Sequence, residues 1–126
     1  MYKNEVGDKT LLLVEDEECN IRIMKCCFNN YINIKIARNG KECVDFIKNN
    51  CVDMILMDYE MPVMNGMEAA KQVRNMKPDI PIVLYTACNI IELINSLKNG
   101  EFVFDDFLYK PAKMEVLQAI VDKYVS

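Results

Sequence analysis

The chain has 126 residues, which suits one domain that can bury a sizeable core. Hydrophobic residues make up 52% and charged residues 27%, and the net charge of −4 without a basic stripe argues against direct binding to nucleic acid. No apolar run approaches the ~20 residues of a membrane-spanning helix, and the start lacks a signal-peptide core. We therefore expect no membrane segment in this chain and a cytoplasmic location.

The six cysteines occur without a single histidine. In the absence of a secretory signal they are expected to stay reduced, and the adjacent Cys26 and Cys27 are poorly placed to bridge each other. No C-x-x-C spacing occurs, so the sequence argues against a structural zinc site.

Short apolar runs alternate with amphipathic stretches five times along the chain. The apolar runs predict strands near 11–15, 33–37, 53–57, 82–85 and 105–109, and the stretches between them predict helices over about 17–30, 41–49, 66–77, 89–99 and 113–124. Gly100 is the predicted C-cap of the fourth helix. Strands separated by helices pair in parallel, and right-handed crossovers place helices on both faces. The sequence thus predicts an α/β fold, a doubly wound five-stranded parallel sheet flanked by five helices.

Polar side chains follow the apolar runs where the strands are predicted to end. Glu15 and Asp16 come after the first strand, Asp58 after the third, Thr86 at the end of the fourth and Lys110 after the fifth. The carboxyl ends of parallel strands meet at one edge of an open α/β sheet, where such folds bind ligands. We therefore expect these five residues to form one site.

Each of these residues has an ordinary structural interpretation when it is taken alone. Asp58 could cap a strand, and Asp16 could be a first-turn acid favoured by the dipole of the first helix. Thr86 could be a core hydroxyl and Lys110 a solvated lysine. The arrangement of all of them along one predicted edge is what favours a functional site.

Four blocks carry a resemblance to a known family: LLLVEDEE, LMDYEMPVMNG, IVLYTA and DDFLYKP, in this order. Together they resemble the receiver domain of two-component response regulators, across residues 10–125. The resemblance implies a flavodoxin-like strand order of 2-1-3-4-5. It divides the chain into an N-terminal extension, 1–9, and a receiver domain, 10–126.

The resemblance also implies phosphoryl chemistry. Asp58 would be the nucleophile and phosphoacceptor, and Lys110 and the Thr86 hydroxyl would bind the phosphoryl oxygens. Movement of Thr86 would open a space for Phe107, three residues before the lysine, to turn inward as a switch. Phe107 could equally be an ordinary core aromatic.

A divalent cation is expected beside the acceptor because an aspartate alone would repel the incoming phosphoryl group. Mg²⁺ or Mn²⁺ prefers oxygen ligands. By resemblance Asp16 and Asp58 would bind the ion directly, Glu15 through water, and Glu60 through its main-chain carbonyl. Glu60 and Cys88, two residues past Asp58 and Thr86, would set the lifetime of the phosphorylated form.

The segment before Lys110 is about two residues longer than is typical of the family. Its extra residues, Phe102, Val103 and Phe104, could extend the fourth helix, bulge the following loop, or be an insertion without a role.

These features predict a module of phosphorelay signalling that is not an enzyme beyond its self-catalysed phosphorylation and dephosphorylation. The chain lacks histidine, so the phosphohistidine donor must act in trans, as a histidine kinase or a histidine phosphotransfer protein. A downstream effector would use the face of the fourth helix, fifth strand and fifth helix. The chain would be a stand-alone regulator or shuttle, or the receiver of a hybrid histidine kinase.

Two other classes remain open at this stage. One is a pseudo-receiver that binds partners without being phosphorylated, although none of the acids, the acceptor or the lysine is lost. The other is a phosphatase with an aspartyl nucleophile, which would need a second aspartate where Glu60 stands.

Overall fold

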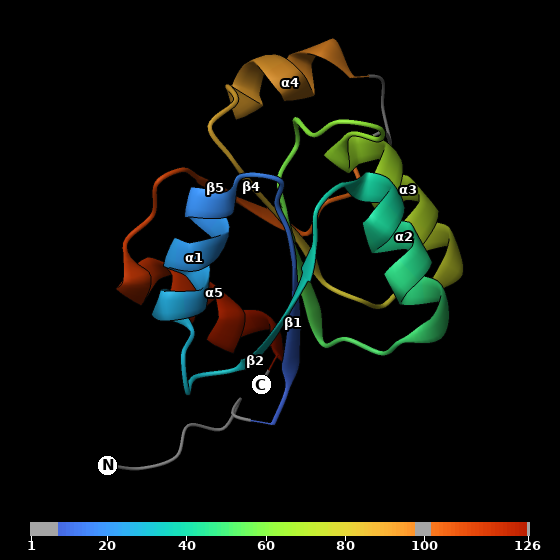
Figure 1. Ribbon diagram of the computed structural model, residues 1–126. Coiled ribbons are helices and arrows are strands. Elements are labelled where there is room, and N and C mark those ends of the chain that lie inside the picture. The colour runs from blue at the N-terminus through green and yellow to red at the C-terminus, as the bar shows by residue number, and fades with distance from the viewer. Residues whose placement is uncertain (1–7, 98–101, 126) are drawn as a thin grey trace.

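Five parallel strands form the centre of the computed structural model, which describes residues 8–97 and 102–125. The strands are β1 (Thr10–Val14), β2 (Asn33–Ala37), β3 (Met54–Met57), β4 (Ile82–Thr86) and β5 (Asp106–Tyr109). They pair in the order β2-β1-β3-β4-β5 (Figure 1). The predicted flavodoxin-like fold and strand order are confirmed.

Helices lie against both faces of this sheet. They are α1 (Glu18–Cys27), α2 (Gly40–Asn49), α3 (Gly66–Met76), α4 (Ile90–Ser96) and α5 (Met114–Val125). Among them, α4 stands beyond the carboxyl edge of the sheet (Figure 1). Buried side chains of α1 and α5 share one core layer, and those of α2, α3 and α4 share the other. Across the described residues, none of the helices has the length and apolar character needed to cross a membrane.

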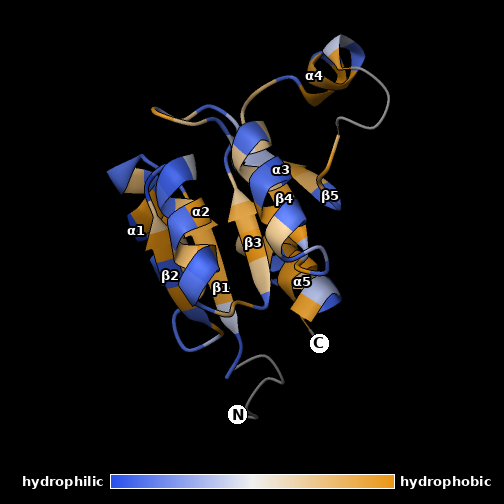
Figure 2. Cartoon of the chain, turned by 90° about the vertical axis from the view of Figure 1, so that its right-hand side faces the viewer, coloured by the Kyte–Doolittle hydropathy of each residue, from blue (hydrophilic) through white to orange (hydrophobic). Residues whose placement is uncertain are grey.

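The three central strands are buried on both faces, which is why their sequences read as continuous apolar runs. Alternate residues of β1 point to opposite layers: Leu12 and Val14 join the α2–α3–α4 layer, while Leu11 and Leu13 join the α1–α5 layer. Figure 2 shows hydrophobic colouring on these strands and hydrophilic colouring on the outer sides of the helices. The first polar residue after each run therefore emerges at the carboxyl edge of the sheet.

Several predicted boundaries need correction. The first helix does not reach Asn30, because Asn30 adopts a positive φ of 62° that a right-handed helix cannot contain. The fourth helix ends at Ser96 rather than near Asn99, and Leu97 after it is extended, with φ −93° and ψ 155°. Its predicted C-cap, Gly100, lies outside the described residues.

The segment before β5 does not extend α4. Residues 102–104 are irregular, and Phe104 is buried in the α2–α3–α4 core layer with an edge contact to Phe102. Arg74 of α3 donates from Nη2 to the Val103 carbonyl at 2.7 Å and to Asp105 Oδ2 at 2.9 Å. The aromatic residues of this longer segment thus return to the core, and Arg74 ties the chain to α3 just before β5.

Of the predicted N-terminal extension, residues 1–7 lie outside the described part of the chain. The Lys9 carbonyl accepts a hydrogen bond from the Asn33 main-chain N–H at 3.0 Å, beside the first residue pair of β1 and β2.

Candidate functional site

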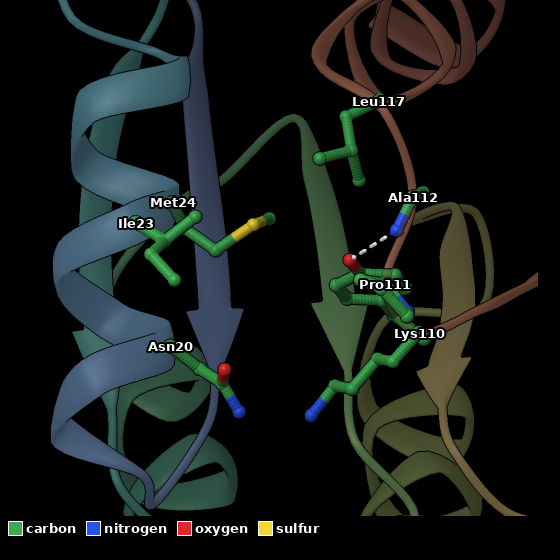
Figure 3. A pocket seen from close by; sticks show the side chains of 8 residues that line it. Asn20, Ile23, Met24, Lys110, Pro111, Ala112 and Leu117 are labelled. Carbon is green, nitrogen blue, oxygen red and sulfur yellow. Dashed lines mark hydrogen bonds between the residues drawn. The ribbon is translucent and has the colours of Figure 1, made fainter.

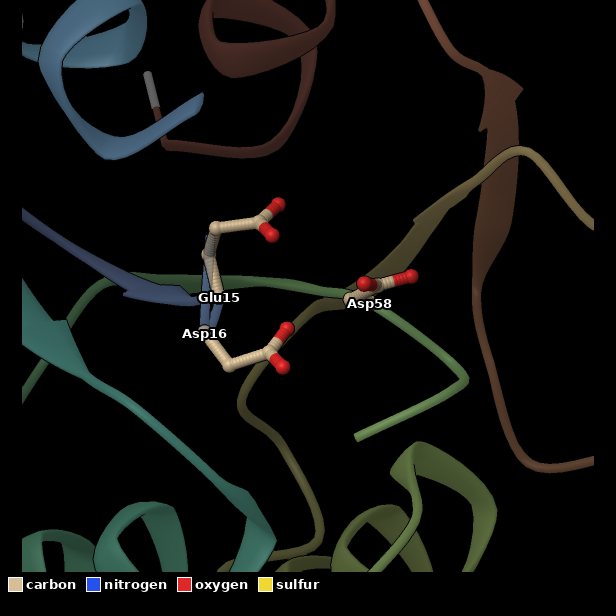
Figure 4. Close-up of side chains that lie close together, drawn as sticks. All are labelled: Glu15, Asp16 and Asp58. Atoms are coloured by element: carbon tan, nitrogen blue, oxygen red, sulfur yellow. The ribbon is translucent and has the colours of Figure 1, made fainter. Parts of the chain in front are cut away.

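The predicted site residues come together at the carboxyl edge of the sheet. Glu15 and Asp16 directly follow β1, Asp58 follows β3, Thr86 is the last residue of β4 and Lys110 follows β5. Figure 4 shows the carboxylates of Glu15 and Asp16 extending to the side on which Asp58 lies. The neighbouring strands β1, β3, β4 and β5 thus deliver the acids, the threonine and the lysine to one edge of the sheet.

The acidic residues can hold a metal ion. One carboxylate oxygen from each of Glu15, Asp16 and Asp58 lies within 4.8 Å of the others. Glu15 is buried, Asp58 is partly buried and Asp16 is exposed, so the cluster opens to solvent on one side. Hard carboxylate oxygens with access for water are the donors that Mg²⁺ prefers, so these residues fit a magnesium ion.

Lys110 lies between two of these carboxylates. Its Nζ is 2.6 Å from Glu15 Oε1 and 3.3 Å from Asp58 Oδ2, and the three side chains are 14%, 2% and 13% exposed. Its main-chain N–H donates to the Thr86 carbonyl at 3.0 Å, which anchors the lysine to the end of β4. The ammonium group is therefore directed at the predicted acceptor from a fixed backbone position.

Burial changes the pKa values of this pair. Burial raises the pKa of Asp58 above its ordinary value; the charge of Lys110 opposes this rise and the charge of Glu15 adds to it. Burial works to lower the pKa of Lys110, but its hydrogen bond to Glu15 and the charge of Asp58 outweigh it and leave the pKa raised. The ammonium therefore stays charged at neutral pH, whereas ionised Asp58 is incompletely stabilised without a metal ion.

Thr86 is 2% exposed, and its Oγ1 accepts a hydrogen bond from the Cys88 main-chain N–H at 3.2 Å. Cys88 is partly buried and Glu60 is exposed. Burial raises the pKa of the Cys88 thiol, and the charges of Glu60 and Asp58 raise it further. The charges of Glu60 and Asp58 thus act on the Cys88 thiol, which is protonated at neutral pH. The roles predicted for Glu60 and Cys88 stay predictions.

Phe107 lies on β5 with its side chain turned outward. It is 40% exposed and makes an edge contact with Tyr109, at 6.0 Å between ring centroids. The interpretation of Phe107 as an ordinary core aromatic is therefore wrong for this structure, because it lies on the solvent side of an edge strand. The predicted inward movement remains a prediction.

Comparison with known proteins agrees with this geometry. The family model of the response regulator receiver domain matches residues 11–122. The chain belongs to this family.

Two curated relatives show the contexts in which similar receiver domains occur. The autoinducer 1 sensor kinase/phosphatase LuxN of Vibrio campbellii is 31% identical over 121 residues, which cover 93% of this chain and 14% of LuxN. The response regulator MprA of Mycobacterium sp. strain KMS is 33% identical over 112 residues, which cover 86% of this chain and 47% of MprA. The chain therefore spans only a part of the length of these relatives.

Solved receiver domains share the fold. The receiver domain of the sensor histidine kinase PA1611 from Pseudomonas aeruginosa, which has magnesium in its active site cleft, matches with a TM-score of 0.84 and 26% identity over 94% of this chain and 98% of that chain. The response regulator TrrA from Thermotoga maritima, in complex with Mg²⁺-BeF, matches with a TM-score of 0.81 and 26% identity. This match covers 92% of this chain and 98% of the TrrA chain.

Sequence reasoning did not find two neighbours of the receiver site. Asn20 of α1 donates from Nδ2 to Glu15 Oε2 at 3.5 Å, and Tyr85 of β4 lies under the Lys110 ammonium, with 5.5 Å from Nζ to the ring centroid. Strand alternation turns Tyr85 away from the face that Thr86 occupies, so its position in the sequence does not indicate that it contacts the site.

Proposed function

We propose that this receiver domain accepts a phosphoryl group on Asp58 from a phosphohistidine of another protein. The contact between Lys110 and Asp58 inside the acidic cluster is the observation that carries this proposal. An Asp58 carboxylate oxygen attacks phosphorus, the P–N bond to the donor imidazole breaks, and the imidazole nitrogen takes up a proton. The product is an aspartyl phosphate and a neutral histidine on the donor.

The remaining site residues act on charge and orientation. Lys110 pairs with a phosphoryl oxygen, and the Thr86 hydroxyl donates to another. Asp16, Asp58 and Glu15, with the main-chain carbonyl of Glu60, would hold Mg²⁺ or Mn²⁺, which neutralises charge on the phosphoryl group. Glu15 also accepts directly from Lys110, so it orders the lysine before a phosphoryl group arrives.

The proposed output is a change in the surface that binds a downstream effector. In the proposal, Thr86 moves toward the phosphoryl group and Phe107 turns inward, which shifts the balance between two packings. Exposed apolar side chains already lie on α4 and β5, the surface proposed for an effector: Ile91, Ile94, Phe107 and Tyr109. The upstream partner is a histidine kinase or a histidine phosphotransfer protein in the cytoplasm, and the domain turns over no external substrate.

Glu60 and Cys88 are proposed to set the lifetime of the aspartyl phosphate, because they lie two residues past Asp58 and Thr86 and the charges of Glu60 and Asp58 act on the Cys88 thiol. Glu60→Asn and Cys88→Glu are therefore expected to change the rate of autodephosphorylation. If both variants lose the phosphoryl group at the wild-type rate, this role is wrong.

Intact mass after incubation with acetyl phosphate tests the proposed function, with and without Mg²⁺. Wild-type protein should gain one phosphoryl group only with the metal, and Asp58→Asn should gain none. Asp45→Asn, an exposed aspartate of α2, is the matched control and should behave as wild type. Absence of any gain, also with a panel of phosphorylated histidine phosphotransfer proteins, would contradict the proposal and favour a pseudo-receiver. Steady release of phosphate from an added phosphoester would instead indicate a phosphatase.

A further inference from the structure

Tyr85 reaches the site from the opposite face of the sheet. It precedes Thr86 in β4, so its side chain enters the core layer that contains α1 and α5. The residue is only 7% exposed. The last two residues of β4 therefore present a hydroxyl on one face and an aromatic ring on the other.

Two different parts of Tyr85 contact the segment that carries Lys110. The Lys110 Nζ lies 5.5 Å from the ring centroid, within the ~6 Å range of a cation–π interaction. The Tyr85 hydroxyl accepts a hydrogen bond from the Ala112 main-chain N–H at 3.0 Å (Figure 3). Ala112 is two residues past the lysine, so the ring faces the ammonium while the hydroxyl fixes the chain that follows.

These contacts complete a frame around Lys110. The Thr86 carbonyl accepts from the main-chain N–H of Lys110, so β4 holds the segment 110–112 at both ends. Beside the Tyr85 ring and the Lys110 stem lies a cavity of about 80 Å³, bordered by Asn20, Met24 and Leu117. This space would let the lysine side chain leave the carboxylates if the ring were absent.

We propose that Tyr85 is a positioning residue that keeps the Lys110 ammonium between Glu15 and Asp58. The ring attracts the ammonium from below, and the hydroxyl keeps the main chain after the lysine from shifting. As a role in phosphoryl transfer, this inference rests on the proposed function, in which Lys110 pairs with the phosphoryl group. As a statement about where the ammonium lies, it can be tested without phosphorylation.

The kinetic test measures phosphorylation by acetyl phosphate at saturating Mg²⁺. Tyr85→Leu removes the ring, and we expect the maximal rate to fall about tenfold with little change in the donor concentration for half-maximal rate. Tyr85→Phe keeps the ring, and we expect a rate within about threefold of wild type. Tyr124→Phe is the control for loss of a tyrosine hydroxyl, because that hydroxyl bonds to Asp106 at the start of β5, at the other end of the strand from Lys110, and its loss should have no effect.

A double-mutant cycle distinguishes an effect of Tyr85 on the position of Lys110 from a general loss of activity in the Tyr85→Leu variant. In a Lys110→Ala background, Tyr85→Leu should change the residual rate less than twofold, because the group that it positions is gone. A full tenfold loss in that background, or a wild-type rate for Tyr85→Leu in the native background, overturns the inference. If Tyr85→Leu does not fold, Tyr85→Met gives a second ringless variant of similar volume.

Ring-current shifts give the readout that does not depend on phosphorylation. In wild type the Lys110 ε-protons should resonate upfield of those of the other lysines, and this shift should vanish in Tyr85→Leu and persist in Tyr85→Phe. Identical Lys110 shifts in wild type and Tyr85→Leu would overturn the inference. Failure of the wild type to accept a phosphoryl group would refute the proposed function alone, because the shifts would still decide the placement of the ammonium.

Discussion

Replacement of Lys110 by methionine should destabilise the metal-free protein strongly. The variant keeps an unbranched side chain but leaves Glu15, only 2% exposed, without its cation at 2.6 Å. At an effective dielectric constant of about 20, that attraction is ~6 kcal/mol. Folding of the wild type also removes hydration from the lysine ammonium, and the variant avoids this cost, which offsets roughly half of the lost attraction. We therefore expect Lys110→Met to lower the free energy of unfolding by about 3 kcal/mol.

Urea unfolding followed by circular dichroism in chelator-containing buffer measures this change. The double variant Glu15→Gln/Lys110→Met removes both charges and should recover most of the loss, to within about 1 kcal/mol of wild type. Lys123→Met, which removes a lysine paired with Asp106 on the exposed side of α5, should leave the unfolding midpoint nearly unchanged. A cost below about 1 kcal/mol for Lys110→Met would refute the reasoning, since the Glu15 carboxylate would then not depend on the ammonium.

Four further changes test other parts of the structure, each by urea unfolding. In metal-free protein the raised pKa of Asp58 means that the folded state binds its proton more tightly, so stability should fall as pH rises from the ordinary value of 3.8 through the folded pKa. Asp58→Asn should remove that fall. Val63→Gly should stabilise the protein by about 1 kcal/mol, because Val63 is 77% exposed and held at φ 71°. Gly66→Ala should cost about 3 kcal/mol, because the new Cβ would lie 2.2 Å from the Asp58 carbonyl oxygen. Arg74→Met should cost about 2 kcal/mol through its lost carbonyl and carboxylate contacts, and Arg74→Lys should recover little because an ammonium cannot reproduce the planar fork of donors.

The sheet and the edge on which the site lies were predictable because burial on both faces imposes apolar runs that stop at polar residues. Asp58 follows β3 directly, and Glu15 follows β1, so parallel pairing alone brings them together. The strand order itself does not follow from these runs. It came from the family resemblance, and the sheet confirms it.

Interactions between side chains distant in sequence were not predictable. Glu15 was expected to contact a metal through water, and its direct bond to Lys110 depends on rotamers of residues 95 positions apart. The extra aromatic segment before β5 could extend a helix or return to the core, and the outcome depends on the packing of Phe104 in the α2–α3–α4 core layer and on hydrogen bonds from Arg74. Local helix and strand propensities predict neither the Glu15–Lys110 contact nor the return of the aromatic segment to the core.

The Glu15–Lys110 pair bears on how strongly the proposed phosphorylation would switch this receiver domain. In the proposed reaction, a phosphoryl group on Asp58 would have to draw the ammonium away from a buried carboxylate that it already contacts at 2.6 Å. The free energy available for switching is the difference between the new contacts and those that are given up, not the strength of the new contacts alone. A metal ion that binds Glu15 and Asp16 would compensate the carboxylate as the lysine leaves. Metal binding and phosphorylation should therefore be coupled through Glu15, and shortening this residue to aspartate should weaken that coupling by lengthening its contact with Lys110.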